Sequence, residues 1–152
     1  MSLIETALQK TDIALETQDY AATGIHAKAT ITADELQKVT RALYSAGFFL
    51  ETVTAVDNLK TEIMQGLWFF DHYKESSRLE IVIEAGRSNP VFPSIGKIYP
   101  GAVWHERETA EFFGITYEGS KDSRGLLLPL DVTFHPLRKD FKRSEHKIAG
   151  IH

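Results

Sequence analysis

The sequence predicts an α+β fold in which one helix packs on a mixed or antiparallel sheet, giving two layers. Three observations predict it. An amphipathic stretch over residues 32–46 follows one alternating segment, three aromatic and β-branched segments come in quick succession over residues 48–85, and prolines then interrupt the chain. The predicted order is therefore a β-α-β-β-β body, followed by short helices and an extended C-terminal arm.

The first half of the body is predicted from side-chain periodicity. Apolar side chains at helical spacing predict a short helix over residues 2–10, and alternation of apolar with polar side chains predicts a half-buried strand over residues 24–31. Thr32 and Glu35 have the spacing of a capping box, so a helix should begin there and run to about Ala46. Its expected inward side chains are Leu36, Val39 and Leu43, with Tyr44 as a further candidate.

Three strand candidates complete the sheet. They are "FFLETVTAVD" at residues 48–57, "EIMQGLWFFDHY" at 62–73 and "RLEIVIEA" at 78–85. All three are rich in β-branched and aromatic or alternating residues, and the joins between them are short and polar, as hairpins require.

The sequence changes character after residue 85. Prolines flank one short helical piece, "SIGKIY" at residues 94–99, and a second helix is predicted over residues 102–113, ended by Gly114. Beyond it the chain has few periodic signals and clustered charge. We therefore divide the chain into a body over residues 1–117, which ends in this helix, and an extended arm over residues 118–152.

Bulk composition narrows the class of protein. With 152 residues and a net charge of -4, the chain suits one globular domain with at most a tail, and it is not a general nucleic-acid binder. It contains no cysteine, which excludes thiolate-ligated iron–sulfur clusters, cysteine zinc sites and disulfides. Early acidic residues argue against a signal peptide, and no apolar run reaches the roughly 18 residues of a membrane span. These features fit a cytoplasmic protein.

The helix predicted over residues 102–113 carries three consecutive charges, Glu106, Arg107 and Glu108, among apolar side chains. At about 100° per residue, Glu106 falls in the middle of the apolar arc. A buried carboxylate costs several kcal/mol unless a cation or backbone donors meet it. The candidate cations lie in the arm and are Arg124, Arg138, Lys139, Lys142 and Arg143.

Two explanations of these charges stay open on the sequence alone. One is a solvated helix with weak ion pairs, in which Arg107 and Glu111 have the i,i+4 spacing of a pair. The other is that the arm folds back onto the helix, or a second protein docks there, and completes the charge set. The basic run "HPLRKDFKR" at residues 135–143 is also compatible with nucleic-acid contact, but Asp140 inside it favours pairing with acids of a neighbouring subunit.

These segments together resemble the signature of the 30 kDa subunit, the C-type subunit, of the proton-pumping NADH:quinone oxidoreductase, respiratory complex I. The matching residues in "ERETAEFFG" are Glu106, Arg107, Glu108, Glu111, Phe112, Phe113 and Gly114, and those that follow are Arg124, Leu126, Leu127, Pro129, Pro136, Leu137, Arg138, Lys139, Asp140 and Phe141. Two positions depart from the family's pattern. Ser120 stands where the family usually has His or Lys, and Val132 stands where it tends to have Trp.

The resemblance implies a scaffold subunit that binds no cofactor itself, while NADH, quinone and iron–sulfur clusters belong to the parent complex. The implied partner is the large quinone-site protein, the D-type subunit, and the implied location is the cytoplasmic face of the inner membrane, reached only through the complex. Related subunits occur in membrane-bound energy-converting nickel–iron hydrogenases, so the type of complex stays open. A free-standing nucleic-acid-binding module is the more distant alternative.

No catalytic centre is expected in the chain itself. It lacks a P-loop, a GxGxxG fingerprint and a GxSxG elbow, and its histidines show no HxH or HExxH spacing. Those histidines are His26, His72, His105, His135, His146 and His152. The residues predicted to fix a partner interface are Glu106, Arg107, Glu108, Glu111, Arg124, Arg138, Lys139 and Asp140.

Overall fold

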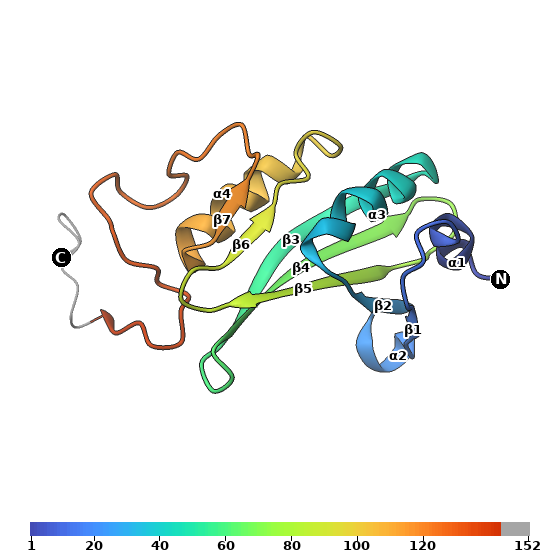
Figure 1. The fold of residues 1–152 in the computed structure, drawn as a ribbon, viewed down its shortest axis with the longest axis horizontal. Coiled ribbons are helices and arrows are strands. Elements are labelled where there is room, and N and C mark those ends of the chain that lie inside the picture. Colours follow the sequence, from blue (N-terminus) through green and yellow to red (C-terminus); the bar gives the residue numbers. More distant parts are fainter. Residues whose placement is uncertain (144–152) are drawn as a thin grey trace.

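The structure is a computed structural model of the chain, and it describes residues 1–143 (Figure 1). The elements follow one another as α1 (Leu3–Leu8), β1 (Glu16–Thr17), α2 (Tyr20–Thr23), β2 (Ala27–Thr30), α3 (Ala33–Ser45), β3 (Phe48–Asn58), β4 (Ile63–His72), β5 (Leu79–Gly86), β6 (Val91–Pro93), α4 (Ala102–Phe113) and β7 (Thr116–Glu118). The predicted α+β class is confirmed.

The main sheet is mixed, as predicted. Its five strands lie in the order β1-β2-β5-β4-β3. β3, β4 and β5 form an antiparallel meander, whereas β2 pairs with β5 in parallel, for example Ala29 opposite Ile81. In the sheet, β5 and β4 lie between β2 and β3. Helix α3, which connects β2 to β3 in the chain, therefore crosses over the sheet. Figure 1 shows α3 over one end of the sheet and α4 beside β3 and β6 at the other.

The core lies between α3, α4 and the sheet. Leu36, Val39 and Leu43 of α3 are fully buried, as predicted, and they share one apolar cluster with Trp68 of β4 and the remaining core residues. The prediction for Tyr44 is wrong, since its side chain is 59% exposed. It lies about 100° further around the helix than Leu43, at the border of the buried face.

Local signals in the body are mostly confirmed. The Glu35 carboxylate accepts hydrogen bonds from the backbone N–H and the hydroxyl of Thr32, at 2.8 and 2.9 Å, and α3 begins there. The predicted helical piece at residues 94–99 is wrong. It forms a single turn, closed by the Tyr99 N–H on the carbonyl of Ile95 at 2.9 Å, and the flanking Pro93 and Pro100 keep this turn from extending into a helix. The short elements β1, α2, β6 and β7 were not predicted.

Helix α4 has the predicted bounds. It ends at Gly114, whose φ of 72° is left-handed and whose N–H donates to the carbonyl of Ala110 at 2.9 Å. The chain then forms β7, which pairs in parallel with β6 as a second, two-stranded sheet. Because β6 and β7 flank α4 in the chain, they fix the helix against the edge of the body.

The first residue of the predicted arm, Glu118, belongs to β7. Residues 119–142 form no helix or strand, and they run back beside α4 (Figure 1). The rest of the predicted arm, residues 144–152 with His146 and His152, lies outside the described residues. In residues 1–143, no helix has the length and apolar character that crossing a bilayer requires.

Candidate functional site

Glu106 is buried in the structure, with 1% of its surface exposed, as its place in the apolar arc predicted. The prediction that a cation of the arm pairs with this carboxylate is wrong, because Glu106 forms no ion pair within residues 1–143. Instead the Ser94 hydroxyl donates to Oε2 at 2.6 Å and the Ile95 N–H donates to Oε1 at 2.8 Å. Burial raises the pKa of Glu106, and these two hydrogen bonds partly oppose that rise.

The loop that supplies these donors fits closely against α4. A Cβ on Gly96 would lie 2.7 Å from Cγ2 of Val103, so glycine allows the loop to approach the helix. On the same buried side of α4, the hydroxyls of Thr109 and Tyr117 are 2.8 Å apart. The buried polar groups of the helix are therefore satisfied by the body itself.

Arg107 binds the arm. Its guanidinium donates to the backbone carbonyls of Arg124 and Gly125, at 3.0 and 2.8 Å, and lies 3.3 Å from a carboxylate oxygen of Asp122. The i,i+4 ion pair between Arg107 and Glu111 is not formed, because both side chains turn to the arm and not to each other. The arm folds back onto the helix, which was one of the two explanations open from the sequence.

Glu111 binds the next stretch of the arm through its backbone. Its carboxylate accepts hydrogen bonds from three consecutive N–H groups, those of Leu126, Leu127 and Leu128, at 3.1, 2.8 and 3.0 Å. Gly125 precedes them, and a Cβ there would lie 3.1 Å from Oε1 of Glu111. One helix side chain thus fixes the direction of a whole turn of the arm.

A second attachment joins the end of the main sheet to the arm. The Arg87 guanidinium donates to both oxygens of Asp57, at 2.6 and 2.9 Å, and to Asp140 of the arm at 2.6 Å. Asp57 also accepts the Lys139 N–H at 2.8 Å. Burial raises the pKa of Asp57, but the hydrogen bonds from Arg87 and Lys139 outweigh it, so that this pKa lies below its ordinary value.

Arg138 adds two bonds at the same attachment. It donates to the carbonyls of Phe113 at 2.7 Å and Arg87 at 3.1 Å, so it ties the end of α4 to the end of β5. Sequence reasoning missed Asp57 and Arg87. The one available signal was an acid and a base at the ends of otherwise apolar strands.

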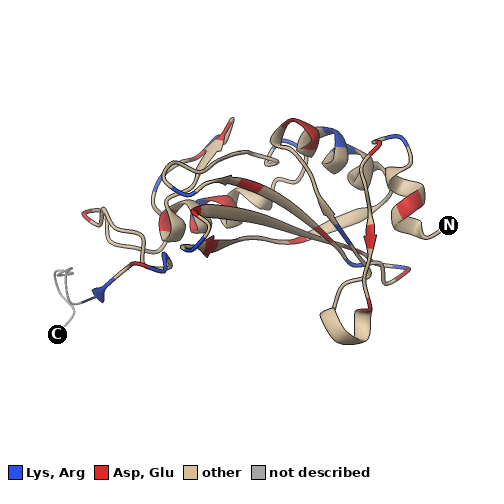
Figure 2. Cartoon of the chain, turned by 60° about the horizontal axis from the view of Figure 1, so that its bottom comes forward, with Lys and Arg blue, Asp and Glu red and all other residues tan. Residues whose placement is uncertain are grey.

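The eight predicted interface residues fall into three groups. Glu106 is buried and bonds only within the body. The residues that hold the arm are Arg107, Glu111, Arg138, Lys139 and Asp140. Within residues 1–143, the side chains of Glu108 and Arg124 make no bond between the helix and the arm. Arg124 pairs with Asp122, and its side chain is 82% exposed. Figure 2 shows basic and acidic residues close together around α4 and the arm. Contact of these residues with a partner stays a prediction.

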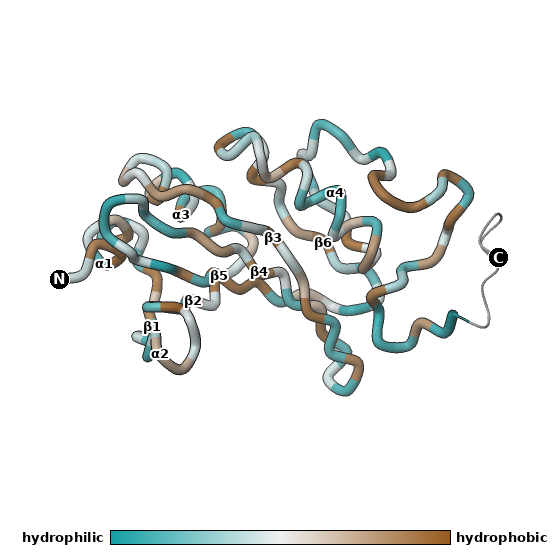
Figure 3. Tube along the Cα trace, turned by 180° about the vertical axis from the view of Figure 1, so that it is seen from behind, coloured by the Kyte–Doolittle hydropathy of each residue, from teal (hydrophilic) through white to brown (hydrophobic). Residues whose placement is uncertain are grey.

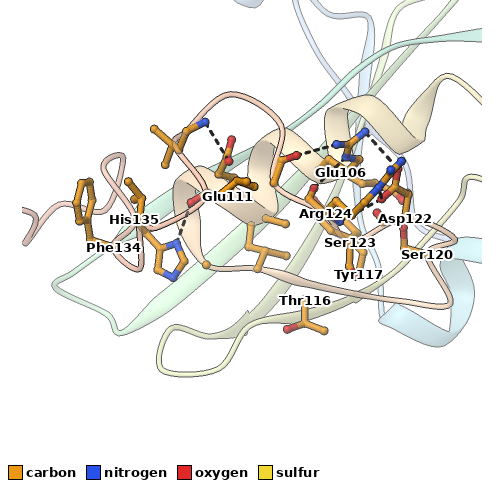
Figure 4. Close-up of a pocket in the computed structure, with 18 of the residues that line it drawn as sticks. Glu106, Glu111, Thr116, Tyr117, Ser120, Asp122, Ser123, Arg124, Phe134 and His135 are labelled. Atoms are coloured by element: carbon orange, nitrogen blue, oxygen red, sulfur yellow. Dashed lines mark hydrogen bonds and ion pairs between the residues drawn. The ribbon is translucent and has the colours of Figure 1, made fainter. Parts of the chain in front are cut away.

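A hollow of about 500 Å³ lies between α4, β7 and the arm (Figure 4). Its carboxylates Glu106, Glu111 and Asp122 are each bound by donors of the chain itself. Among residues 1–143, no three acidic or histidine side chains converge as a metal site would require. The arrangement suits holding a chain segment in place.

By fold and site, this is an α+β domain whose C-terminal arm is fixed along one helix by charged side chains. Residues 29–147 match the family described as "Respiratory-chain NADH dehydrogenase, 30 Kd subunit", and the chain belongs to this family. The resemblance seen in the Glu-Arg-Glu and Pro-Leu-Arg-Lys-Asp-Phe segments is confirmed.

Curated relatives carry the corresponding name. The chain is 34% identical over 102 residues to the C-type subunit of the NADH-quinone oxidoreductase of Roseiflexus sp. (strain RS-1), a match covering 66% of this chain and 59% of that protein. It is 40% identical over 68 residues to the protein of the same name from Chloroherpeton thalassium, covering 45% of this chain and 28% of that protein. The matches therefore span less than two thirds of the length of these relatives.

Solved structures share the fold. A chain of the membrane-bound sulfane sulfur reductase, an archaeal respiratory membrane complex, superimposes with a TM-score of 0.79 at 20% identity, covering 97% of this chain and 91% of that chain. A trypsin-resistant fragment of Nqo5 gives a TM-score of 0.66 at 18% identity, covering 80% and 99%.

Proposed function

We propose that the chain is an accessory subunit of the peripheral arm of a proton-pumping NADH:quinone oxidoreductase of the complex I type. It carries no catalytic centre and docks on the large quinone-site subunit. Membership of the 30 kDa family supports this, as do relatives named as the C-type subunit of NADH-quinone oxidoreductases. The fold also occurs in a respiratory membrane complex.

One observation carries the docking proposal: the surface formed by α4 and the arm is fixed before any partner binds, yet it leaves apolar side chains outside. The arm is attached through Arg107, Glu111 and Arg87. On the same surface the side chains of Trp104 and Leu137 are 61% and 52% exposed. A preformed surface that exposes large apolar side chains among charged ones suits a protein interface, which combines both kinds of group.

The redox groups are assigned to other subunits. The chain has no cysteine for an iron–sulfur cluster, and the carboxylates of its hollow are already bound by donors of the chain itself. NADH, quinone and the clusters therefore belong to the parent complex in this proposal. The chain reaches the cytoplasmic face of the membrane through that complex.

The test is recovery of the complex from native membranes through an affinity tag on this chain, followed by mass spectrometry of the copurified proteins. The proposal expects the large quinone-site subunit and NADH:quinone activity in the eluate. A tagged chain recovered without other subunits would overturn it. Copurification of a nickel–iron subunit would instead support the equivalent subunit of an energy-converting hydrogenase, and salt-sensitive nucleic acid in the eluate would support a nucleic-acid-binding module.

A further inference from the structure

The arm presents an unusual apolar turn. Residues 125–130 read "GLLLPL", and we refer to them as the leucine loop. The side chains of Leu127 and Leu130 are 62% and 99% exposed, whereas Leu126 and Leu128 are half-buried. A single exposed leucine is ordinary on a protein surface, but two within four residues are a candidate contact. Figure 3 shows hydrophobic stretches along the arm, away from the sheet.

The loop is fixed by bonds to its backbone. The Glu111 carboxylate accepts the N–H groups of Leu126, Leu127 and Leu128, and the Arg107 guanidinium donates to the carbonyl of Gly125. With these backbone groups held, the side chains of the loop have set directions. A loop ordered in advance loses little conformational entropy on binding. Most of the free energy gained by burying the exposed leucines is therefore available to strengthen binding.

The surroundings of the loop indicate a protein partner. Arg124 lies on one side of the loop, where it pairs with Asp122 and its side chain is 82% exposed. Asp131, exposed, follows Leu130 directly. A carboxylate beside the most exposed leucine would be repelled by an anionic lipid surface and is costly to bring near hydrocarbon. Opposite charges on a protein surface can instead complement both groups.

We propose that Leu127 and Leu130 are the anchors of the interface, and that they insert into an apolar cleft on the partner subunit. The rim of that cleft carries a carboxylate facing Arg124 and a cation facing Asp131. The inference rests on the proposed function, since it describes the partner surface that an accessory subunit of this shape requires.

The test compares tagged chains carrying Leu127→Ser, Leu130→Ser or both with a matched control, Leu59→Ser. Leu59 is 42% exposed and lies in the turn between β3 and β4. Quantitative mass spectrometry of the partners recovered from membranes is the readout. Since burial of one leucine corresponds to about 10- to 100-fold in affinity, each loop variant should recover at least tenfold less partner, whereas the control recovers the parental amount. Melting temperatures should be unchanged, because the replaced side chains are exposed.

Two results would overturn the loop proposal alone. One is undiminished recovery of the partner by the double variant, which leaves the proposed function standing. The other is flotation of the purified chain with phosphatidylcholine–phosphatidylglycerol vesicles that depends on Leu130, which would assign the loop to a membrane surface. A parental chain that recovers no partner would overturn the proposed function as well.

Discussion

The Arg87 guanidinium lies 2.6 Å from a carboxylate oxygen of Asp57 and, through another nitrogen, 2.6 Å from Asp140. One buried cation therefore joins β3, the end of β5 and the arm. The side chain of Asp57 is fully buried and that of Arg87 is 8% exposed, so water is largely excluded from this pair.

Removal of this cation should be strongly destabilising. Arg87→Met leaves the buried Asp57 without its partner, and we expect a loss of about 3–5 kcal/mol in the free energy of unfolding, measured by urea denaturation. Arg124→Met is the matched control, because its ion pair with Asp122 is open to solvent, and it should have little effect. Equal losses in the two variants would show that burial of the Arg87 pair does not matter.

The pH dependence of stability should report the burial of Glu106. Its pKa in the folded chain lies above the ordinary value of 4.5, so the folded state favours the neutral carboxyl. Its contribution is complete below the ordinary pKa and declines as the pH rises through the folded pKa. Glu106→Gln removes the titration and keeps an acceptor for the Ser94 hydroxyl.

The measurement is urea denaturation of Glu106→Gln and the parent from pH 4 upward. Relative to the variant, the parent should lose stability as the pH rises from about 4.5. A stability difference that is independent of pH would contradict the raised pKa.

Gly114 should tolerate no side chain. Its backbone is left-handed, and a Cβ would lie 2.6 Å from the ring of His135. Gly114→Ala combines the cost of the left-handed conformation, about 1–2 kcal/mol, with displacement of the arm from the end of α4. Gly101→Ala, where a Cβ meets nothing within 4 Å, is the control and should melt like the parent. A parental melting temperature for Gly114→Ala would refute the close contact.

Amide hydrogen exchange should show that Glu111 orders the leucine loop. In Glu111→Ala the three N–H groups of Leu126, Leu127 and Leu128 lose their acceptor. Since a hydrogen bond to a charged group is worth about 1.5–3 kcal/mol, their exchange should become about 10- to 100-fold faster. Amides in the centre of β5 should keep their parental rates. Unchanged exchange in the loop would mean that other contacts order it.

The sequence predicted the elements that have a strong local pattern. The bounds of α4 could be predicted because Gly114 ends it, and α3 because Thr32 and Glu35 begin it. The three long strands carry enough β-branched and aromatic residues to be recognised. The short pair β6 and β7 could not be predicted, because three residues carry no periodicity and the pairing is made only by the tertiary fold.

The site was predicted in part. Burial of Glu106 follows from helix geometry, but its partners do not. Ser94 and Ile95 reach it only because a loop with Gly96 packs on the helix, which no local pattern reveals. Asp57 and Arg87 were missed because they are 30 residues apart, and Arg87 and Asp140 are 53 apart. Pairs at such separations are decided by topology.

Site-specific photo-crosslinking tests most directly whether the surface of α4 and the arm docks on a larger subunit. A photoreactive residue at Leu137, on the arm, is compared with one at Tyr73, an 83% exposed side chain just after β4. In native membranes, we predict crosslinks from position 137 to one large partner and none from position 73. Crosslinks from position 73 with none from position 137 would contradict the docking surface proposed for this chain.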